Sequence, residues 1–130
     1  MRQVVCAVMQ NDRGMFLAAQ RAYGSMAGKW EFPGGKLEVG ETPQQACERE
    51  LFEELGIRVK AAETIFSNHI EVGSDSFKLL FVRAEWLSGE MSPAEHKELR
   101  WVCHNELHSL DWLEGDIPMV KWLQARSSPP

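Results

Sequence analysis

The sequence predicts an α/β fold in which a mixed sheet lies between helices, and several features of the chain support this. The segment 3–9 is apolar and rich in β-branched residues, as is typical of a buried strand. Residues 42–56 have the composition of a helix with clear ends. Residues 77–82 alternate so that one face of a strand is firmly apolar. Together with a second helix starting at Gly115 or Asp116, these elements indicate a sheet flanked by helices.

Further strands complete the expected sheet. They are placed at residues 15–19, 30–32, 62–72, 77–86 and 99–102. Asn11–Gly14 has turn chemistry, so the strand that follows it should return as the hairpin partner of the first strand. Residues 22–29 contain two glycines and are expected to form a mobile loop. Residues 127–130 look like a loose tail, which leaves residues 1–126 as a single domain.

The ends of the central helix can be assigned from local chemistry. Thr42 is a good N-cap, Pro43 suits the first helical position, and Gln45 completes a capping box with Thr42. Gly56 is placed to adopt the left-handed conformation that closes the helix. The residues expected to face the core are Ala46, Leu51 and Leu55, with Cys47 as a small packing residue.

The same helix carries a cluster of acidic residues. Glu50, Glu53 and Glu54 fall within an arc of roughly 100° on an α-helix. Like charges on one face destabilise a helix unless a cation lies among them. Carboxylate oxygens are hard ligands, so the pattern indicates Mg²⁺ or Mn²⁺ rather than zinc. A solvated acidic helix face is the alternative explanation.

Composition excludes some classes of function. The formal net charge is −5 and the basic residues are scattered, whereas a groove for polymeric nucleic acid needs a basic face. The longest apolar run near the N-terminus, Val4–Met9, is too short to cross a membrane. Three widely spaced cysteines indicate neither a disulfide framework nor a zinc site, so a reduced, cytoplasmic location is expected.

The acidic helix and the glycine-rich turn before it also fill a known pattern. Every fixed position of the Nudix box is occupied, by Gly35, Glu41, Arg49, Glu50, Leu51, Glu53, Glu54, Gly56 and Ile57. The chain therefore resembles the Nudix hydrolases, which cleave nucleoside diphosphates linked to another moiety. This resemblance implies a Nudix-type α/β/α sandwich. The flanking segments Trp30–Lys36 and Gly40–Pro43 look like the MutT branch, which hydrolyses nucleoside triphosphates.

The resemblance implies roles for the acidic residues. The box glutamates would be metal ligands, with the carbonyl group of Gly35 as a further candidate. Glu95, six residues before Trp101, would bind metal or act as the general base, in competition with Glu53; an ordinary loop glutamate is the alternative. Arg49 is expected to orient the glutamates rather than to contact the substrate. Glu41 could assist the metal cluster or serve the start of the helix.

The candidate residues for substrate binding are Arg21, Phe32, Lys36, Phe77 and Asp116. Lys36 could bind a phosphate group or be a solvated turn residue. The two phenylalanines could stack on a base or pack in the core. Asp116 stands where MutT uses an asparagine to read the base, and an ionised aspartate only accepts hydrogen bonds. It looks more like the bacterial CTP pyrophosphohydrolase branch, although a plain helix N-cap is the alternative.

The expected function is Mg²⁺-dependent hydrolysis of a nucleoside triphosphate to the monophosphate and pyrophosphate. The substrate would be a small, oxidised or modified nucleotide of the 8-oxo-dGTP or CTP and 5-methyl-dCTP type. Two alternatives stay open. One is hydrolysis of another nucleoside diphosphate derivative, such as a dinucleoside polyphosphate or ADP-ribose, and the other is a non-catalytic nucleotide-sensing module. The sequence leaves open whether the protein is a monomer or a homodimer.

Overall fold

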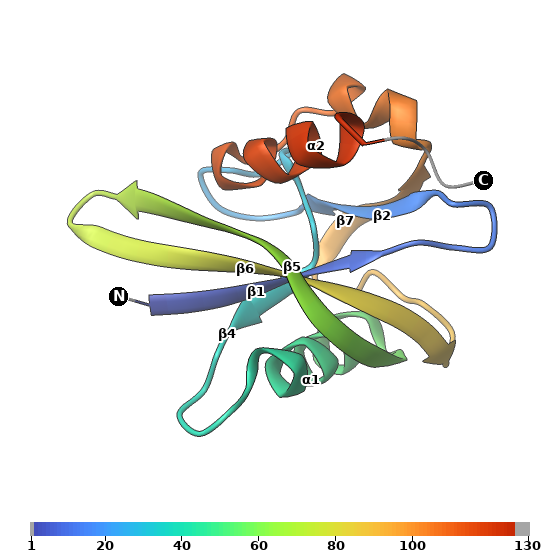
Figure 1. Cartoon of the computed structure of the whole chain (residues 1–130), viewed down its shortest axis with the longest axis horizontal. Helices are drawn as coiled ribbons and strands as arrows, with labels where there is room; N and C mark the ends of the chain where they lie inside the picture. Colours follow the sequence, from blue (N-terminus) through green and yellow to red (C-terminus); the bar gives the residue numbers. More distant parts are fainter. Residues whose placement is uncertain (1, 127–130) are drawn as a thin grey trace.

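The computed structural model describes residues 2–126, so the expected tail at 127–130 lies outside the described residues. Within this range, strands form two sheets and helices cover them (Figure 1). The elements in chain order are β1 (Arg2–Met9), β2 (Phe16–Arg21), β3 (Trp30–Glu31), β4 (Gly34–Lys36), α1 (Pro43–Leu55), β5 (Arg58–Val72), β6 (Asp75–Ser88), β7 (His96–Val102), the short 3₁₀ helices η1 (His104–Ser109) and η2 (Glu114–Asp116), and α2 (Ile117–Gln124).

The predicted α/β class, with a mixed sheet between helices, is confirmed. The larger sheet has the strand order β4-β1-β6-β5, in which β1 runs parallel to β6 and antiparallel to β4. The smaller sheet, β3-β2-β7, is antiparallel throughout. Helices α1 and α2 lie on opposite sides of the larger sheet (Figure 1). Because β1 alternates, its odd-numbered residues Val5, Ala7 and Met9 pack towards α1, and Cys6 and Val8 pack towards α2.

The predicted hairpin between the first two strands is wrong. The turn itself is present, since the side chain of Asn11 accepts hydrogen bonds from the backbone N–H groups of Arg13 and Met15. Both edges of β1, however, are occupied by β4 and β6, so β2 has no edge of β1 along which to pair. The end of β1 and the start of β2 are joined only by an isolated antiparallel bridge between Gln10 and Phe16. From there β2 continues into the smaller sheet.

The two long strands of the larger sheet extend further than the sequence predicts. β5 begins at Arg58 rather than near residue 62, and β6 runs from Asp75 to Ser88. They pair antiparallel across nearly their whole length, with irregularities between Ala61 and Phe66. Hydrogen bonding to the neighbouring strand extends each strand into polar residues at its ends, and a pattern of alternating apolar residues does not predict these. The expected strand at 99–102 likewise begins earlier, at His96.

The central helix begins and ends as predicted. The Thr42 side chain accepts a hydrogen bond from the Gln45 backbone, and the Gln45 side chain accepts one from the Thr42 backbone. Gly56 closes the helix with φ of 72°. Ala46, Leu51 and Leu55 are fully buried against the larger sheet. Cys47 is buried with them, and burial raises the pKa of its thiol to about 12, as expected for a packing residue.

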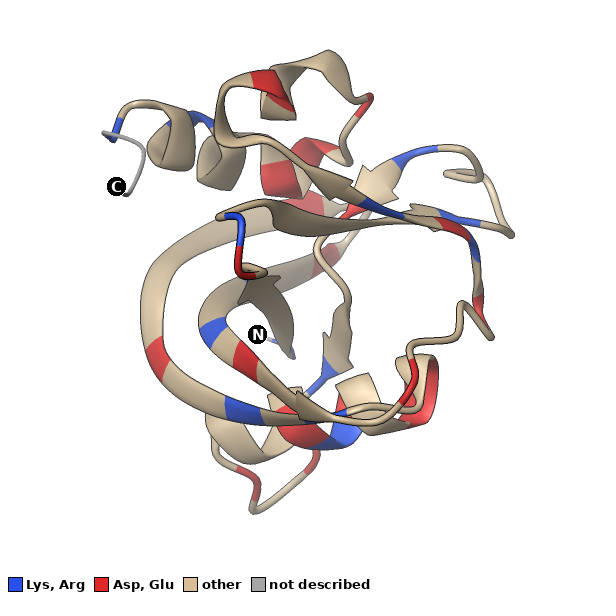
Figure 2. Cartoon of the chain, turned by 90° about the vertical axis from the view of Figure 1, so that its right-hand side faces the viewer, with Lys and Arg blue, Asp and Glu red and all other residues tan. Residues whose placement is uncertain are grey.

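The distribution of charged residues and the length of the helices concern two possible partners, polymeric nucleic acid and the membrane. Figure 2 shows acidic and basic residues interspersed along the ribbon. None of the helices in residues 2–126 has the length and apolar character that a membrane crossing requires.

Candidate active site

Two glycines of the turn before α1 allow the helix to approach the larger sheet closely. Gly35 lies opposite Val5 in the β1–β4 pairing, and the carboxyl group of Glu50 rests directly against it. A Cβ atom on Gly35 would overlap that carboxyl group. The neighbouring Gly34 is packed equally closely on the backbone of Val5. The glycine-rich turn therefore lies directly against β1 and Glu50, because only glycine leaves room for these contacts.

Arg49 gathers the acidic side chains around this turn. Its guanidinium group donates to both carboxylate oxygens of Glu41, at 2.6 Å and 2.9 Å. It also donates to Glu50 at 2.9 Å, to Glu53 at 3.0 Å and to the carbonyl oxygen of Lys36 at 3.0 Å. The hydrogen bond from Arg49 lowers the pKa of Glu41 to about 2. These contacts give Arg49 an orienting position of the kind expected from the sequence.

Glu54 is the buried member of the acidic cluster. Burial raises the pKa of its carboxyl group to about 9, and hydrogen bonding and charge from Glu50 contribute next. The charges of Glu31 and Glu95 raise the pKa of Glu54 further, which places both groups near it. One of its oxygens, Oε2, is buried without a hydrogen-bond partner. A carboxylate in this setting is costly unless positive charge is brought to it.

The three box glutamates do not converge fully. Glu50 and Glu54 interact, but the side chain of Glu53 is 52% exposed and is bound to Arg49 instead. Within residues 2–126, no three acidic, histidine or cysteine side chains are close enough to form a ready metal site. Like charges repel, and Arg49 offers Glu53 a nearer partner. To join Glu50 and Glu54 at a metal ion, the side chain of Glu53 would have to leave Arg49.

The donor set nevertheless fits a divalent cation. It consists of hard oxygen atoms and includes the unpartnered Oε2 of Glu54, whose pKa is raised by burial and then by the neighbouring carboxyl groups. The ligands best placed to hold the ion are Glu50 and Glu54, together with the backbone of Gly35 against which Glu50 rests. Glu53 could join after rotation. Glu95 is exposed directly before β7 and lies close enough for its charge to act on Glu54.

Sequence reasoning missed two residues that lie beside Glu54. His96 has a side chain only 4% exposed, with Nε2 2.9 Å from Glu31 Oε2 and 3.7 Å from Glu54 Oε1. Glu31 also accepts a hydrogen bond from Arg21 at 3.0 Å. The available signals were the position of Glu31 directly before the Phe-Pro-Gly-Gly turn and the alternation of β7, which directs His96 inwards when its neighbours are exposed.

The proposed substrate-binding residues are placed differently from one another. Lys36 is exposed on the turn, and Arg21 is engaged with Glu31. Phe32 is buried and stacks on Trp112 with ring centroids 4.7 Å apart, so core packing accounts for it. Phe77 is half-buried at the start of β6.

Asp116 is buried, and its carboxyl group accepts a hydrogen bond from the backbone N–H of Phe32 at 2.8 Å. It occupies the N-cap position of α2, but its side chain makes no capping hydrogen bond. Burial raises the pKa of the carboxyl group to about 7. One oxygen of the carboxyl group is therefore bound by the backbone of Phe32, and the group does not cap the helix.

Asp116 should make stability depend on pH. A carboxyl group that titrates near 7 when folded and near 3.8 when unfolded favours folding at low pH, and this contribution is lost as pH rises from about 4 to 7. Each pKa unit corresponds to about 1.4 kcal/mol. The free energy of unfolding can be measured by urea unfolding with a metal chelator present. Between pH 4.5 and pH 8, that of the wild type should fall by on the order of 2–3 kcal/mol relative to that of Asp116→Asn. Parallel pH profiles for the two proteins would contradict the shifted pKa.

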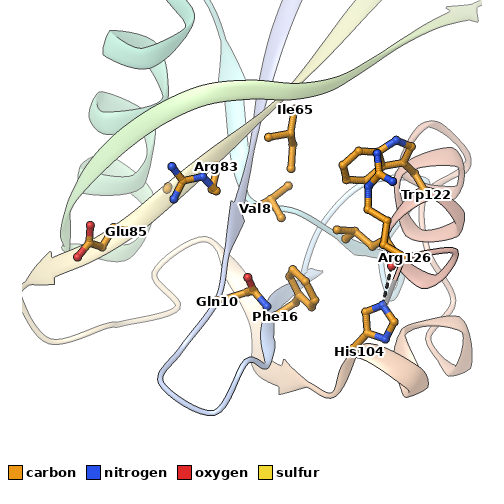
Figure 3. Close-up of a pocket in the computed structure, with 11 residues that line it drawn as sticks. Val8, Gln10, Phe16, Ile65, Arg83, Glu85, His104, Trp122 and Arg126 are labelled. Carbon is orange, nitrogen blue, oxygen red and sulfur yellow. Dashed lines mark hydrogen bonds between the residues drawn. The ribbon is translucent and has the colours of Figure 1, made fainter. Parts of the chain in front are cut away.

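A separate cavity of about 360 Å³ lies between the larger sheet and α2. Figure 3 shows Arg126 over Trp122 on one side of this cavity, with Arg83 and Glu85 of β6 on another. None of the site residues predicted from the sequence lines it. The acidic site on α1 and this cavity are therefore distinct features of the fold.

Comparison with known proteins identifies the family. A model of the NUDIX domain matches residues 1–123. The chain belongs to the Nudix family. The CTP pyrophosphohydrolase of Escherichia coli (strain K12) is 34% identical to it over 125 residues, which are 96% of this chain and 93% of that protein. The 8-oxo-dGTP diphosphatase of the same organism is 32% identical over 123 residues, which are 94% and 95% of the two chains.

A solved structure agrees with this fold. The solution structure of the Escherichia coli ORF135 protein matches with a TM-score of 0.84 at 36% identity, and covers 96% of this chain and 89% of that one. Nudix hydrolases generally use divalent metal ions and act on small nucleotide substrates. The acidic helix therefore lies in a fold whose relatives carry out metal-dependent nucleotide chemistry.

Proposed function

We propose that this Nudix protein is a hydrolase of phosphoric anhydride bonds that converts a nucleoside triphosphate to the monophosphate and pyrophosphate. The observation that carries the proposal is the pair formed by the half-buried Glu50 and the buried Glu54, in which Glu50 lies against Gly35 and accepts a hydrogen bond from Arg49. Relatives named CTP pyrophosphohydrolase and 8-oxo-dGTP diphosphatase align with this chain over nearly its whole length, which supports the same reaction.

In this proposal, each acidic residue has a distinct task. Glu50, Glu54, Glu53 and the Gly35 carbonyl would hold Mg²⁺, or Mn²⁺ as a substitute. A bound divalent cation would offset the charge of the phosphates and lower the pKa of a water molecule. Glu53 or Glu95 would accept the proton of the attacking water, since both are exposed and reach solvent. Arg49 holds the carboxylates in place and leaves Lys36 available to bind a phosphate group.

The base would be read on the α2 side of the larger sheet. One oxygen of Asp116 already accepts from Phe32, so the other would accept from the amino group of cytosine or from a donor on a damaged purine. Phe77 would contribute an apolar wall, whereas Phe32 supports the site from within the core. We place the protein in the cytoplasm, where residues 1–126 would act as one domain that clears modified nucleotides before DNA replication and repair.

A substrate panel with identification of the products tests the proposal. With Mg²⁺ present, we expect 8-oxo-dGTP, CTP or 5-methyl-dCTP to yield the monophosphate and pyrophosphate, and chelation to abolish the reaction. Release of AMP and ribose phosphate from ADP-ribose as the main activity would contradict the proposal. So would the absence of turnover together with the absence of thermal stabilisation by Mg²⁺, because this pair of results indicates a non-catalytic module.

A further inference from the structure

His96 lies where two groups of charged residues meet. On one side, Arg21 donates to Glu31 Oε1 at 3.0 Å, and the second oxygen of Glu31 lies 2.9 Å from His96 Nε2. On the other side, the same Nε2 lies 3.7 Å from Oε1 of Glu54. The histidine therefore joins the end of β2, which leads into the loop at residues 22–29, to the acidic face of α1.

The polar atoms that remain unsatisfied gather along the same path. In the described part of the chain, the buried side-chain atoms without a hydrogen-bond partner are Arg21 Nε, His96 Nδ1 and Glu54 Oε2. Native proteins contain few such atoms, and each one calls for an explanation. Here all of them belong to one connected set of contacts that ends at the candidate metal site. This concentration distinguishes the set from ordinary core packing and points to a functional constraint.

The two oxygens of Glu54 face different surroundings. Oε1 is the oxygen near His96, while Oε2 is buried and has no partner. A histidine ring buried against Oε1 restricts how the carboxylate can rotate, because the ring itself is held by Glu31. This division leaves Oε2 as the oxygen free to bind a cation. Neighbours that orient a metal ligand in this way commonly change metal affinity when they are removed.

We propose that His96 is a positioning residue that fixes the carboxylate of Glu54 for the divalent cation and links it through Glu31 to Arg21. This inference rests on the proposed function, since it assumes that Glu54 is a metal ligand. His96 itself contacts neither the cation nor the nucleotide. Its effect is to hold one ligand in a binding orientation before the ion arrives, so that less ordering accompanies binding.

The primary test is Mn²⁺ binding without nucleotide, measured by electron paramagnetic resonance at fixed pH. We expect His96→Leu, which still fills the buried position but loses the donor, to weaken Mn²⁺ affinity about 10–100-fold. His96→Gln places an amide donor near the position of Nε2 and should stay within about threefold of wild type. His69→Leu, at an exposed site on β5, is the matched control and should bind as wild type does.

Kinetics supply a second signature. If His96 acts through metal binding, kcat of His96→Leu at low Mg²⁺ should fall by a similar factor of about 10–100 and recover as Mg²⁺ is raised. The KM for the nucleotide, measured at saturating Mg²⁺, should change little, because the side chain does not touch the substrate. A residue that only fills space would not give a defect that Mg²⁺ reverses.

The outcomes separate this inference from the proposed function. A folded His96→Leu protein with wild-type Mn²⁺ affinity would overturn the positioning role, as would a His96→Gln protein as defective as His96→Leu. Should His96→Leu fail to fold, His96→Asn is compared with His96→Gln instead. The amide of Asn is too short to replace Nε2, so the His96→Asn protein should bind Mn²⁺ less tightly than the His96→Gln protein. Equal affinities for that pair would also overturn the role. Wild type that binds no Mn²⁺ would instead overturn the proposed function, and the present inference with it.

Discussion

Replacement of Glu53 by Gln is expected to lower kcat for nucleoside triphosphates by about 10²–10⁴, the range typical of a lost general base. The substitution removes the charge and basicity of a carboxylate that is exposed and able to turn from Arg49 towards Glu50 and Glu54. The fold should not change, since Glu53 packs against nothing in the core. Steady-state kinetics at saturating Mg²⁺, with the unfolding temperature as a check, measure the effect.

Glu48→Gln is the matched control for this experiment. Glu48 is exposed on the same helix and accepts a hydrogen bond from the backbone of Ala61, which the Gln amide oxygen can still accept. It should retain near-normal kcat. Near-normal turnover by Glu53→Gln would remove that residue from the chemistry. Glu95→Gln, measured in parallel, decides which of the two glutamates acts as the base, because the larger loss of kcat belongs to that residue.

Gly34→Ala should produce the largest loss of stability that the structure predicts. A Cβ atom there would overlap the carbonyl oxygen of Val5 and lie 2.8 Å from its carbonyl carbon. These are backbone atoms of the central strand β1, which is paired on both sides and cannot move aside. We expect the free energy of unfolding to fall by about 3 kcal/mol or more, and the unfolding temperature by about 10 °C.

The comparison variant is Gly73→Ala, in the turn between β5 and β6. An added Cβ there meets nothing within 4 Å, so the cost is only that of a left-handed backbone with φ of 62°, about 1 kcal/mol. Thermal and urea unfolding of both variants separate overlap with β1 from backbone strain. Equal losses for the two variants would show that the close contact with β1 is unimportant.

Local sequence rules were enough for the central helix. The Thr42 cap, the Gln45 partner and Gly56 act within a few residues of one another, and each was found where the sequence placed it. The acidic residues of the box could be located for the same reason. What the sequence did not show is how Glu53 is oriented, because that depends on competition between its neighbours and Arg49.

Features that depend on distant residues escaped sequence reasoning. The wrong hairpin arose because β1 is paired by β4 and β6, and nothing in the turn at 11–14 reveals those partners. Glu31 and His96 are 65 positions apart, and Phe32 and Asp116 are 84 apart. The first pair meets because Glu31 lies on β3 and His96 on β7, and β2 pairs with both of these strands. A motif marks such residues only when it spans them, and the Nudix box does not.

The central position of β1 has a consequence for how the site tolerates change. Its side chains pack alternately into the core under α1 and the core under α2, and the carbonyl group of Val5 lies against Gly34. A slip of this strand by one position would exchange the two layers and carry the glycine turn away from Glu50. A shift in the register of β1 would therefore lower both stability and catalysis. Selection for a well-packed core then also maintains the geometry of the acidic residues.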